Sequence, residues 1–249
     1  MQRGARRRVL DWAFNQRMIA RVLGPECVLC LGDSHVGIFR RVRVPGVWFR
    51  QYSIGGATAS GILNPSNQSE SFRLFTARLA RARPWQHVLL MLGEVDCGFL
   101  IWHRANRHNL TVDEQLELTL DSYTTFISRL LGQGFKSVIV MSTPLPTIDD
   151  SPEPIGEVAS LRRAVTATKA ERTALTLRFN AELQKRCEKM GVAFIDATSG
   201  HLDPETGLVD RHFLRASARN HHLAPGPYGD LISAEFSRQW FDKPDARAA

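Results

Sequence analysis

The chain has 249 residues, of which 43% are hydrophobic and 23% are charged. This size and composition are typical of one globular domain with a substantial buried core. No apolar run is long enough for a membrane-spanning helix, so no transmembrane segment is expected. The four arginines within residues 1–8 lead into no apolar run, so a secretory signal is not predicted either. We therefore expect a cytoplasmic protein.

The net charge of +7 is concentrated near the N-terminus. Residues 1–50 contain ten arginines and three acidic residues, so the rest of the chain is balanced. A solvated basic segment is one interpretation, and contact with an anionic substrate, lipid headgroups or nucleic acid is the other. No nucleic-acid-binding motif is present, so no nucleic-acid partner is expected. We divide the chain into a basic N-terminal segment (1–24), one α/β domain (25–243) and a tail (244–249).

The four cysteines are expected to be reduced and buried, because a cytosolic domain of this size needs no disulfide. They are Cys27, Cys30, Cys97 and Cys187. Cys27 and Cys30 form a Cys-x-x-Cys pattern, which raises redox or metal chemistry as an alternative. The pair lies inside an apolar run rather than at the start of a helix, and this placement favours two buried small side chains.

Short apolar runs alternate along the chain with longer amphipathic segments. Strands are predicted at 27–31, 47–54, 87–92, 137–142 and 192–196. Such alternation favours a three-layer α/β domain, in which helices cover both faces of a mainly parallel sheet of about five strands. Ligands of such sheets bind in the loops at the carboxyl ends of the strands.

Three helices are predicted with defined ends. Thr111 and Glu114 form a capping box that begins a helix, and apolar residues at helical spacing continue it to the glycines at 132 and 134. A second helical stretch covers roughly 157–190, with a bend or break inside it. The last helix spans about 228–240. The segment 147–156 is predicted to be a long loop at the rim of the binding site.

The first strand is followed by Gly-Asp-Ser-His at residues 32–35. A strand that stops at a glycine before Asp and Ser can start a helix there, which places the Ser34 hydroxyl in the cleft. A serine so placed can act as a nucleophile, and its own N–H can stabilise an oxyanion. Helix capping by Asp33 or Ser34 is the structural alternative.

Other strand ends carry further polar residues. Gly55 and Gly56 follow the second strand, Gly-Glu-Val-Asp-Cys at 93–97 follows the third, and His221-His222-Leu223-Ala224-Pro225 precedes the last helix. This order and spacing resemble the SGNH, or GDSL-type, hydrolase family over roughly residues 27–240. The resemblance implies an SGNH-type fold, Ser34 as nucleophile, His222 as general base with His221 as the alternative, and oxyanion-hole N–H groups at Ser34 and Gly56.

Two positions depart from the family pattern. Val95 stands where the family has an Asn whose amide is a further oxyanion donor, and one such donor is worth about 10²–10³ in rate. The family also has an Asp three residues before the histidine, where this chain has Arg219 before His222, or Ala218 before His221. In a serine protease, changing the supporting Asp lowers kcat by about 10⁴. The motif Gly-Glu-x-Asp-Cys resembles a less characterised bacterial branch of the superfamily.

The carboxylates of Glu94 and Asp96 are candidates for a hydrogen bond to a substrate hydroxyl or to a histidine. A solvated Glu94 and a turn-capping Asp96 are the structural alternatives. We include Asp33 in the catalytic set. The predicted substrate contacts are His35, Gly55, Glu94, Asp96, Cys97 and Trp102. Asp196, Asp203 and Asp210 are further carboxylates that a histidine could use.

The combined pattern predicts an acyl-ester hydrolase or O-acyltransferase that works through an acyl-serine, without cofactor or metal. The expected substrate is a small-molecule or glycan ester, with deacetylation preferred. The alternative is a binding or regulatory protein that keeps the fold with little turnover. A metal held by Asp96, Cys97, His103 and His108 is disfavoured, because no ligand spacing organises them.

Overall fold

The domain is built around a parallel sheet of five strands. The computed structural model describes residues 25–67, 69–150, 165–217 and 220–241. The strands are β1 (Glu26–Gly32), β2 (Val47–Ser53), β3 (His87–Met91), β4 (Ser137–Met141) and β5 (Ala193–Ile195). Their order is β2-β1-β3-β4-β5, and every neighbouring pair is parallel. The predicted α/β class and all five predicted strands are confirmed.

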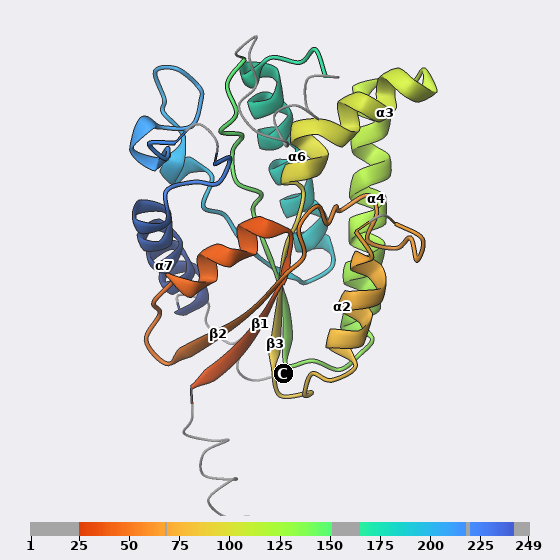
Figure 1. Ribbon diagram of the computed structural model, residues 1–249. Coiled ribbons are helices and arrows are strands. Elements are labelled where there is room, and N and C mark those ends of the chain that lie inside the picture. The colour runs from red at the N-terminus through yellow and green to blue at the C-terminus, as the bar shows by residue number, and fades with distance from the viewer. Residues whose placement is uncertain (1–24, 68, 151–164, 218–219, 242–249) are drawn as a thin grey trace, which may run out of the picture.

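Helices cover both faces of this sheet (Figure 1). One face packs against α2 (Ser71–Leu79), α4 (Val112–Leu131) and α6 (Lys169–Lys189). The other face packs against the 3-10 helix η1 (Ser34–Arg40) and α7 (Pro225–Phe241). The remaining helical elements, all near the loops of the domain, are η2 (Asp96–Leu100), α3 (Ile101–His108), η3 (Ser199–His201) and η4 (Arg211–Phe213).

Burial on both faces explains the unbroken apolar runs of the central strands. Along β1, Leu29 and Leu31 enter the core beneath α2, α4 and α6, whereas Val28 and Cys30 enter the core beneath η1 and α7. All four cysteines are free and buried, as predicted. Cys30 is a side chain of the core, and burial raises the pKa of its thiol well above the ordinary value.

Capping boxes set the starts of two long helices. Thr111 caps α4 as predicted: its hydroxyl accepts from the Glu114 N–H at 3.1 Å, and the Glu114 carboxylate accepts from the Thr111 N–H at 2.7 Å. Thr168 and Glu171 form the same box at the start of α6. Because Thr168 has an extended backbone, the helix begins at Lys169, and the predicted helical stretch from 157 is wrong for residues 165–168. Residues 157–164 lie outside the described part.

The last helix begins at Pro225, three residues before the predicted start. Proline suits the first turn of a helix because its missing N–H would have no intrahelical partner there. This start matters for the site, since it brings the end of the preceding loop, with His222, close to the beginning of α7.

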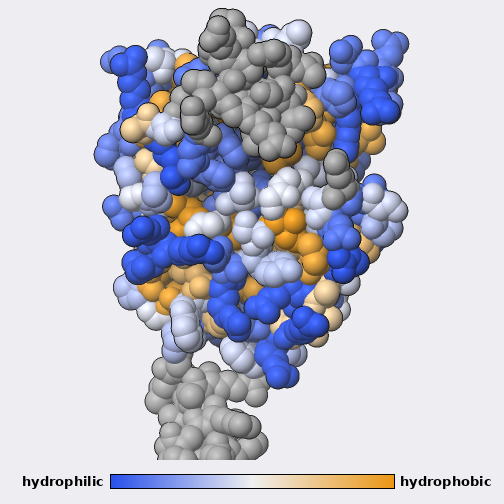
Figure 2. Space-filling model, viewed as in Figure 1, coloured by the Kyte–Doolittle hydropathy of each residue, from blue (hydrophilic) through white to orange (hydrophobic). Residues whose placement is uncertain are grey.

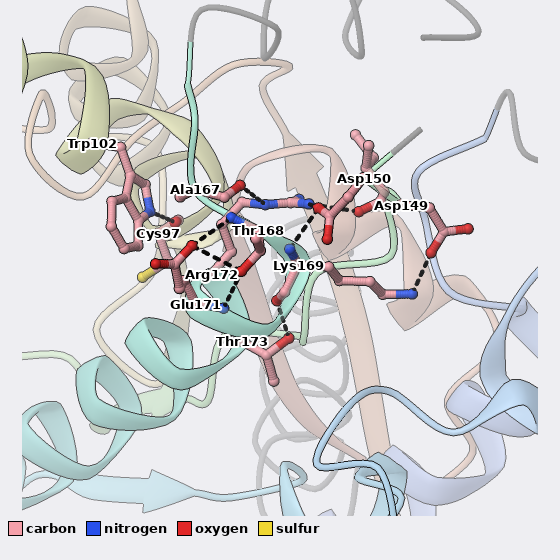
Figure 3. A network of polar contacts seen from close by, with 11 residues as sticks. Cys97, Trp102, Asp149, Asp150, Ala167, Thr168, Lys169, Glu171, Arg172 and Thr173 are labelled. Atoms are coloured by element: carbon pink, nitrogen blue, oxygen red, sulfur yellow. Dashed lines mark hydrogen bonds and ion pairs between the residues drawn. The ribbon is translucent and has the colours of Figure 1, made fainter. Parts of the chain in front are cut away.

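Two buried cations join the loop after β4 to α6 (Figure 3). The Lys169 ammonium lies 2.7 Å from a carboxylate oxygen of Asp149, and the Arg172 guanidinium lies 2.8 Å from one of Asp150. Arg172 also donates to the Ile148 carbonyl at 2.8 Å. The beginning of the predicted rim loop, up to Asp150, is therefore anchored to the helix, and its continuation from residue 151 lies outside the described residues.

The surface carries no broad apolar area on the face seen in Figure 2, where hydrophobic residues appear as small areas among hydrophilic ones. Such a mixture is ordinary for a folded domain. Within the described residues, no helix is both long and apolar enough to cross a membrane. The basic N-terminal segment and the C-terminal tail lie outside the described residues.

Candidate active site

Ser34 stands where β1 gives way to η1. Close packing requires Gly32, the last residue of β1, to be a glycine, because a Cβ there would lie 2.0 Å from the Met91 carbonyl oxygen of β3. Asp33 then caps η1, and its carboxylate accepts from the backbone N–H of His35 at 2.8 Å. The helix starts immediately after the strand, so the half-buried Ser34 lies at the carboxyl edge of the sheet.

The hydroxyl of Ser34 lies 2.8 Å from Nε2 of His222, which is 188 residues away in the chain. The other ring nitrogen, Nδ1, lies 2.9 Å from Oδ1 of Asn220. The backbone N–H of His222 donates to the same oxygen at 3.1 Å, so the amide atom that faces the histidine is an acceptor. Nδ1 must therefore carry the proton, which leaves the lone pair of Nε2 to accept from Ser34.

The loop that carries His222 is fixed by its neighbours. Leu223 is buried in the core beneath α7, and its carbonyl accepts from Arg215 at 3.1 Å. The Ala224 N–H donates to the Phe213 carbonyl at 2.7 Å. These contacts hold the histidine by its backbone on the side of the sheet where η1 lies.

His222 is uncharged at neutral pH. Burial lowers its pKa, the neighbouring His35 and His221 lower it further, and the pKa falls to about 3 despite the opposing charge of Glu94. Arg215 adds a small lowering effect. The free base is therefore always available to accept a proton, but the imidazolium that forms after proton transfer is disfavoured.

Two more histidine rings surround His222. Its ring centroid lies 4.6 Å from that of His35 and 4.2 Å from that of His221. The His221 carbonyl accepts from the Thr147 hydroxyl at 2.6 Å, which ties this loop to the beginning of the rim loop. Of the two histidines proposed as the base, His222 is the one placed in hydrogen-bond contact with Ser34.

The side-chain contacts of Asp33 are with its neighbour His35. Its side chain is 1% exposed, and one carboxylate oxygen serves both the His35 N–H and, at 3.0 Å, the His35 Nδ1. The carboxylate therefore positions His35 and caps η1, which is the structural alternative raised from the sequence. His35 itself is buried, and its ring lies beside that of His222.

The carboxylate of Asp96 is also internal. Its side chain is fully buried, and it accepts from the backbone N–H groups of Ala59 at 2.7 Å and Ser60 at 3.1 Å. Burial raises its pKa, and these hydrogen bonds only partly oppose that effect. Asp96 thus fixes the loop after β2, and its contact with substrate stays a prediction.

Two other predicted substrate contacts pack inside the domain. Cys97 is fully buried, and burial raises the pKa of its thiol well above the ordinary value. Trp102 is half-buried and donates from Nε1 to the Cys97 carbonyl at 2.8 Å (Figure 3). This hydrogen bond joins α3 to η2, the helical element that follows the loop after β3. The predicted substrate contacts of Cys97 and Trp102 stay predictions.

Glu94, Gly55 and Gly56 follow the two strands that neighbour β1, namely β3 and β2. Glu94 is buried, and its charge acts on His222. Gly55 and Gly56 are exposed in the turn after β2, and Gly56 has φ +71°, a conformation that favours glycine. Because β2 is the neighbour of β1, this turn lies at the same edge of the sheet as Ser34.

Asn220 is the site residue that sequence reasoning missed. The family pattern predicts a supporting Asp three residues before the histidine, where this chain has Arg219 or Ala218, and both of these residues lie outside the described part. The carboxylates of Asp196, Asp203 and Asp210 instead accept from nearby backbone N–H groups of Thr198, Glu205 and His212. The available signal was Asn two residues before His, a spacing at which an Asx side chain reaches the backbone N–H.

Among the described residues, one group has the spacing of possible metal ligands, namely His35, His221 and His222. The cluster suggested from the sequence, around Asp96 and Cys97, is not among such groups. The site thus combines a serine, a neutral histidine, an amide that fixes its tautomer, and two further imidazoles.

Solved structures of other proteins share this fold. A Bacteroides fragilis protein described as an acylhydrolase has a TM-score of 0.55 at 15% identity, covering 86% of this chain and 85% of that one. A GDSL-like lipase from Bacteroides thetaiotaomicron has a TM-score of 0.54 at 16% identity, covering 86% of both chains. An acetylxylan esterase from Geobacillus stearothermophilus, solved as a catalytic mutant, has a TM-score of 0.50 at 15% identity, covering 86% and 93%.

These similarities establish the SGNH-type hydrolase fold that the motif order predicted. No protein-family model and no curated protein sequence matches the chain. At identities near 15% the fold alone is shared, so the activity has to be argued from the residues of this site.

Proposed function

We propose that the chain is a serine-dependent acyl-ester hydrolase or acyltransferase. The observation that carries this proposal is the 2.8 Å contact between the Ser34 hydroxyl and Nε2 of His222, with Nδ1 held by Asn220. A nucleophile, a base and a group that orients the base are the three parts required for acyl transfer through a serine.

In the proposed reaction, Oγ of Ser34 attacks the acyl carbon while its proton moves to Nε2 of His222. The tetrahedral oxyanion is stabilised by the backbone N–H groups of Ser34 and Gly56. The intermediate collapses, the ester C–O bond breaks, and the imidazolium gives its proton to the departing alcohol. Water or a sugar hydroxyl then attacks the acyl-serine, loses its proton to His222, and releases the acyl product and the free serine.

The pKa of His222 suggests that this reaction is slow on unactivated esters. An imidazolium formed next to His35 and His221 is costly, and Asn220 offers a dipole where serine hydrolases commonly offer a full negative charge. Glu94 is the carboxylate whose charge favours the protonated histidine. Its negative charge is therefore proposed to assist proton transfer, in part replacing the missing Asp.

The preferred substrates are acetyl esters of carbohydrates or small metabolites. One solved structure with this fold is an acetylxylan esterase. The test is hydrolysis of p-nitrophenyl acetate, p-nitrophenyl butyrate and acetylated xylo-oligosaccharides by wild type and by Ser34→Ala in the presence of a chelator. Turnover by the wild type that disappears in Ser34→Ala supports the proposal. Including a sugar acceptor and analysing products by mass spectrometry separates transfer from hydrolysis.

The low basicity of His222 and the presence of Val95 favour a second candidate, a binding or regulatory protein with little turnover. It predicts that an acetylated ligand binds with the same affinity to wild type and to Ser34→Ala, with no product formed by either.

A further inference from the structure

Three imidazoles converge at the proposed site from opposite ends of the chain. His35 comes from η1, and His221 and His222 come from the loop before α7. One ring nitrogen from each lies within 4.8 Å of the other two. The mechanism uses His222 alone, so it gives no reason for the other two rings to lie so near.

The three ring nitrogens are close enough together to form a metal site after a small rearrangement. Three imidazoles with an open fourth position are a ligand set of catalytic zinc, and bonds of about 2.0–2.1 Å in a tetrahedron place the ligand nitrogens roughly 3.3 Å apart. The nitrogens here would each have to approach by at most about 1.5 Å. His221 and His222 lie in a loop, where changes in side-chain rotation can supply that approach.

The outer contacts of two of these rings match those of metal-binding histidines. Such histidines typically donate their second N–H to a carboxylate or another oxygen acceptor, which fixes the tautomer and the ring orientation. Here Nδ1 of His35 lies 3.0 Å from the Asp33 carboxylate, and Nδ1 of His222 lies 2.9 Å from the Asn220 amide oxygen. In both rings Nε2 is then the atom suited to a metal.

We propose that His35, His221 and His222 together bind one divalent transition-metal ion, best fitted by Zn²⁺, and that the bound ion breaks the contact between Ser34 and His222. The lone pair of His222 Nε2 accepts the Ser34 proton in the metal-free protein. The same lone pair cannot bind a metal and accept that proton. The metal is thus an inhibitor of serine chemistry, and only this inhibition rests on the proposed function.

Metal binding is tested with the full-length protein after removal of metals by a chelator and dialysis. Co²⁺ replaces Zn²⁺ as a visible probe, because tetrahedral cobalt absorbs strongly where octahedral cobalt does not. We expect one equivalent of Co²⁺ to give tetrahedral bands, which one equivalent of Zn²⁺ then abolishes. His221→Gln should weaken binding by at least about 100-fold, since even outer-shell changes cost 10–100-fold.

His212→Gln is the matched control, because it removes an exposed histidine outside the cluster. It should bind as the wild type does. His221→Gln keeps the hydrogen bond from Thr147, because that bond goes to the backbone carbonyl of residue 221, and we expect the variant to fold. Circular dichroism checks this. Absence of tetrahedral cobalt in the wild type, or equal binding by a folded His221→Gln, would overturn the proposed metal site.

The competition is tested by labelling Ser34 with a fluorophosphonate at increasing Zn²⁺. At about 100 times the Kd, labelling should slow about 100-fold, because only the metal-free fraction reacts. His221→Gln should label at the same rate with and without Zn²⁺. If the wild type labels equally fast when its cobalt-binding site is filled, the competition is wrong. If it never labels without metal, the proposed hydrolase function fails instead, and the cobalt spectrum still decides the metal site.

Discussion

The amide oxygen of Asn220 lies 2.9 Å from Nδ1 of His222 and holds the imidazole in the tautomer that faces Ser34. This relationship supplies orientation without a negative charge. It explains how a histidine can be correctly placed although the residue at the usual position of the supporting Asp differs. It also predicts that geometry and basicity at this site can be changed separately.

Replacing Asn220 tests its role as a positioning residue. Asn220→Ala should lower kcat about 10- to 100-fold with KM nearly unchanged, a smaller loss than the roughly 10⁴ caused by changing the Asp of a serine protease. Asn220→Asp should keep the hydrogen bond, add a charge that stabilises the imidazolium, and raise kcat above the wild-type value. Steady-state kinetics in chelator are the measurement. Equal kcat in all three proteins would show that the contact has no role in turnover.

Val95 is the position at which a third oxyanion donor is expected from the family resemblance. It precedes η2 and is half-buried. Val95→Asn should raise kcat, by up to about 10²–10³ if the amide reaches the oxyanion. Val95→Leu is the control, because leucine is close to asparagine in shape but donates no hydrogen bond. A rise in both variants would point to altered packing, and no rise in Val95→Asn would mean that the amide does not reach the oxyanion.

Asp96 is expected to be important for stability. Asp96→Ala leaves the buried N–H of Ala59 and the N–H of Ser60 without their carboxylate acceptor, at a cost of about 1–3 kcal/mol for each buried group. Thermal unfolding should show a fall in Tm of roughly 5–15 °C. Below its Tm the variant should still react with a fluorophosphonate. A normal Tm with lost labelling would restore Asp96 to a direct role at the site.

His201 makes stability depend on pH. Its Nδ1 donates to the Ala197 carbonyl at 2.7 Å and its Nε2 accepts from the Leu145 N–H at 3.2 Å, so the native state holds the neutral ring. Burial lowers its pKa to about 4, although Ala197 and Asp196 oppose this effect. The unfolded state therefore binds the proton first, and stability is complete above about pH 6.5 and falls as pH drops toward 4.

The magnitude follows from the difference between the two pKa values. Between pH 7 and pH 4.5 the His201 contribution should fall by about 2–3 kcal/mol. Urea unfolding of wild type and His201→Gln at both pH values measures it. The variant is less stable at pH 7 but should lose about 2–3 kcal/mol less on acidification. Parallel losses in the two proteins would assign the pH dependence to other groups.

The central strands β1, β3 and β4 were predictable because they are buried on both faces, and their apolar runs are therefore visible in the sequence. The edge strand β2 is only partly buried. Helix starts were predictable where a capping box had been recognised, as at Thr111, and wrong where the box at Thr168 had been overlooked. Ser34 and His222 followed from the order of motifs. The backbone contacts of Asp33 and Asp96 did not, since the sequence does not show which N–H groups a carboxylate at a strand end accepts from.

The convergence of three histidines was equally hidden. His35 and His221 are separated by most of the chain, and only the return of the last loop over η1 brings them within 5.7 Å between ring centroids. Asn220 was missed for a related reason. Its amide oxygen accepts from both the backbone N–H and Nδ1 of His222, from a position two residues earlier, which no motif with an Asp three residues earlier describes.

Covalent labelling of the metal-free protein with a fluorophosphonate, followed by peptide mass spectrometry, tests the serine mechanism most directly. The wild type should carry one adduct on Ser34, Ser34→Ala should carry none, and His222→Gln should label far more slowly because the hydroxyl has lost its base. An unlabelled Ser34 in folded wild-type protein, or a labelling rate that His222→Gln leaves unchanged, would contradict the proposed pair.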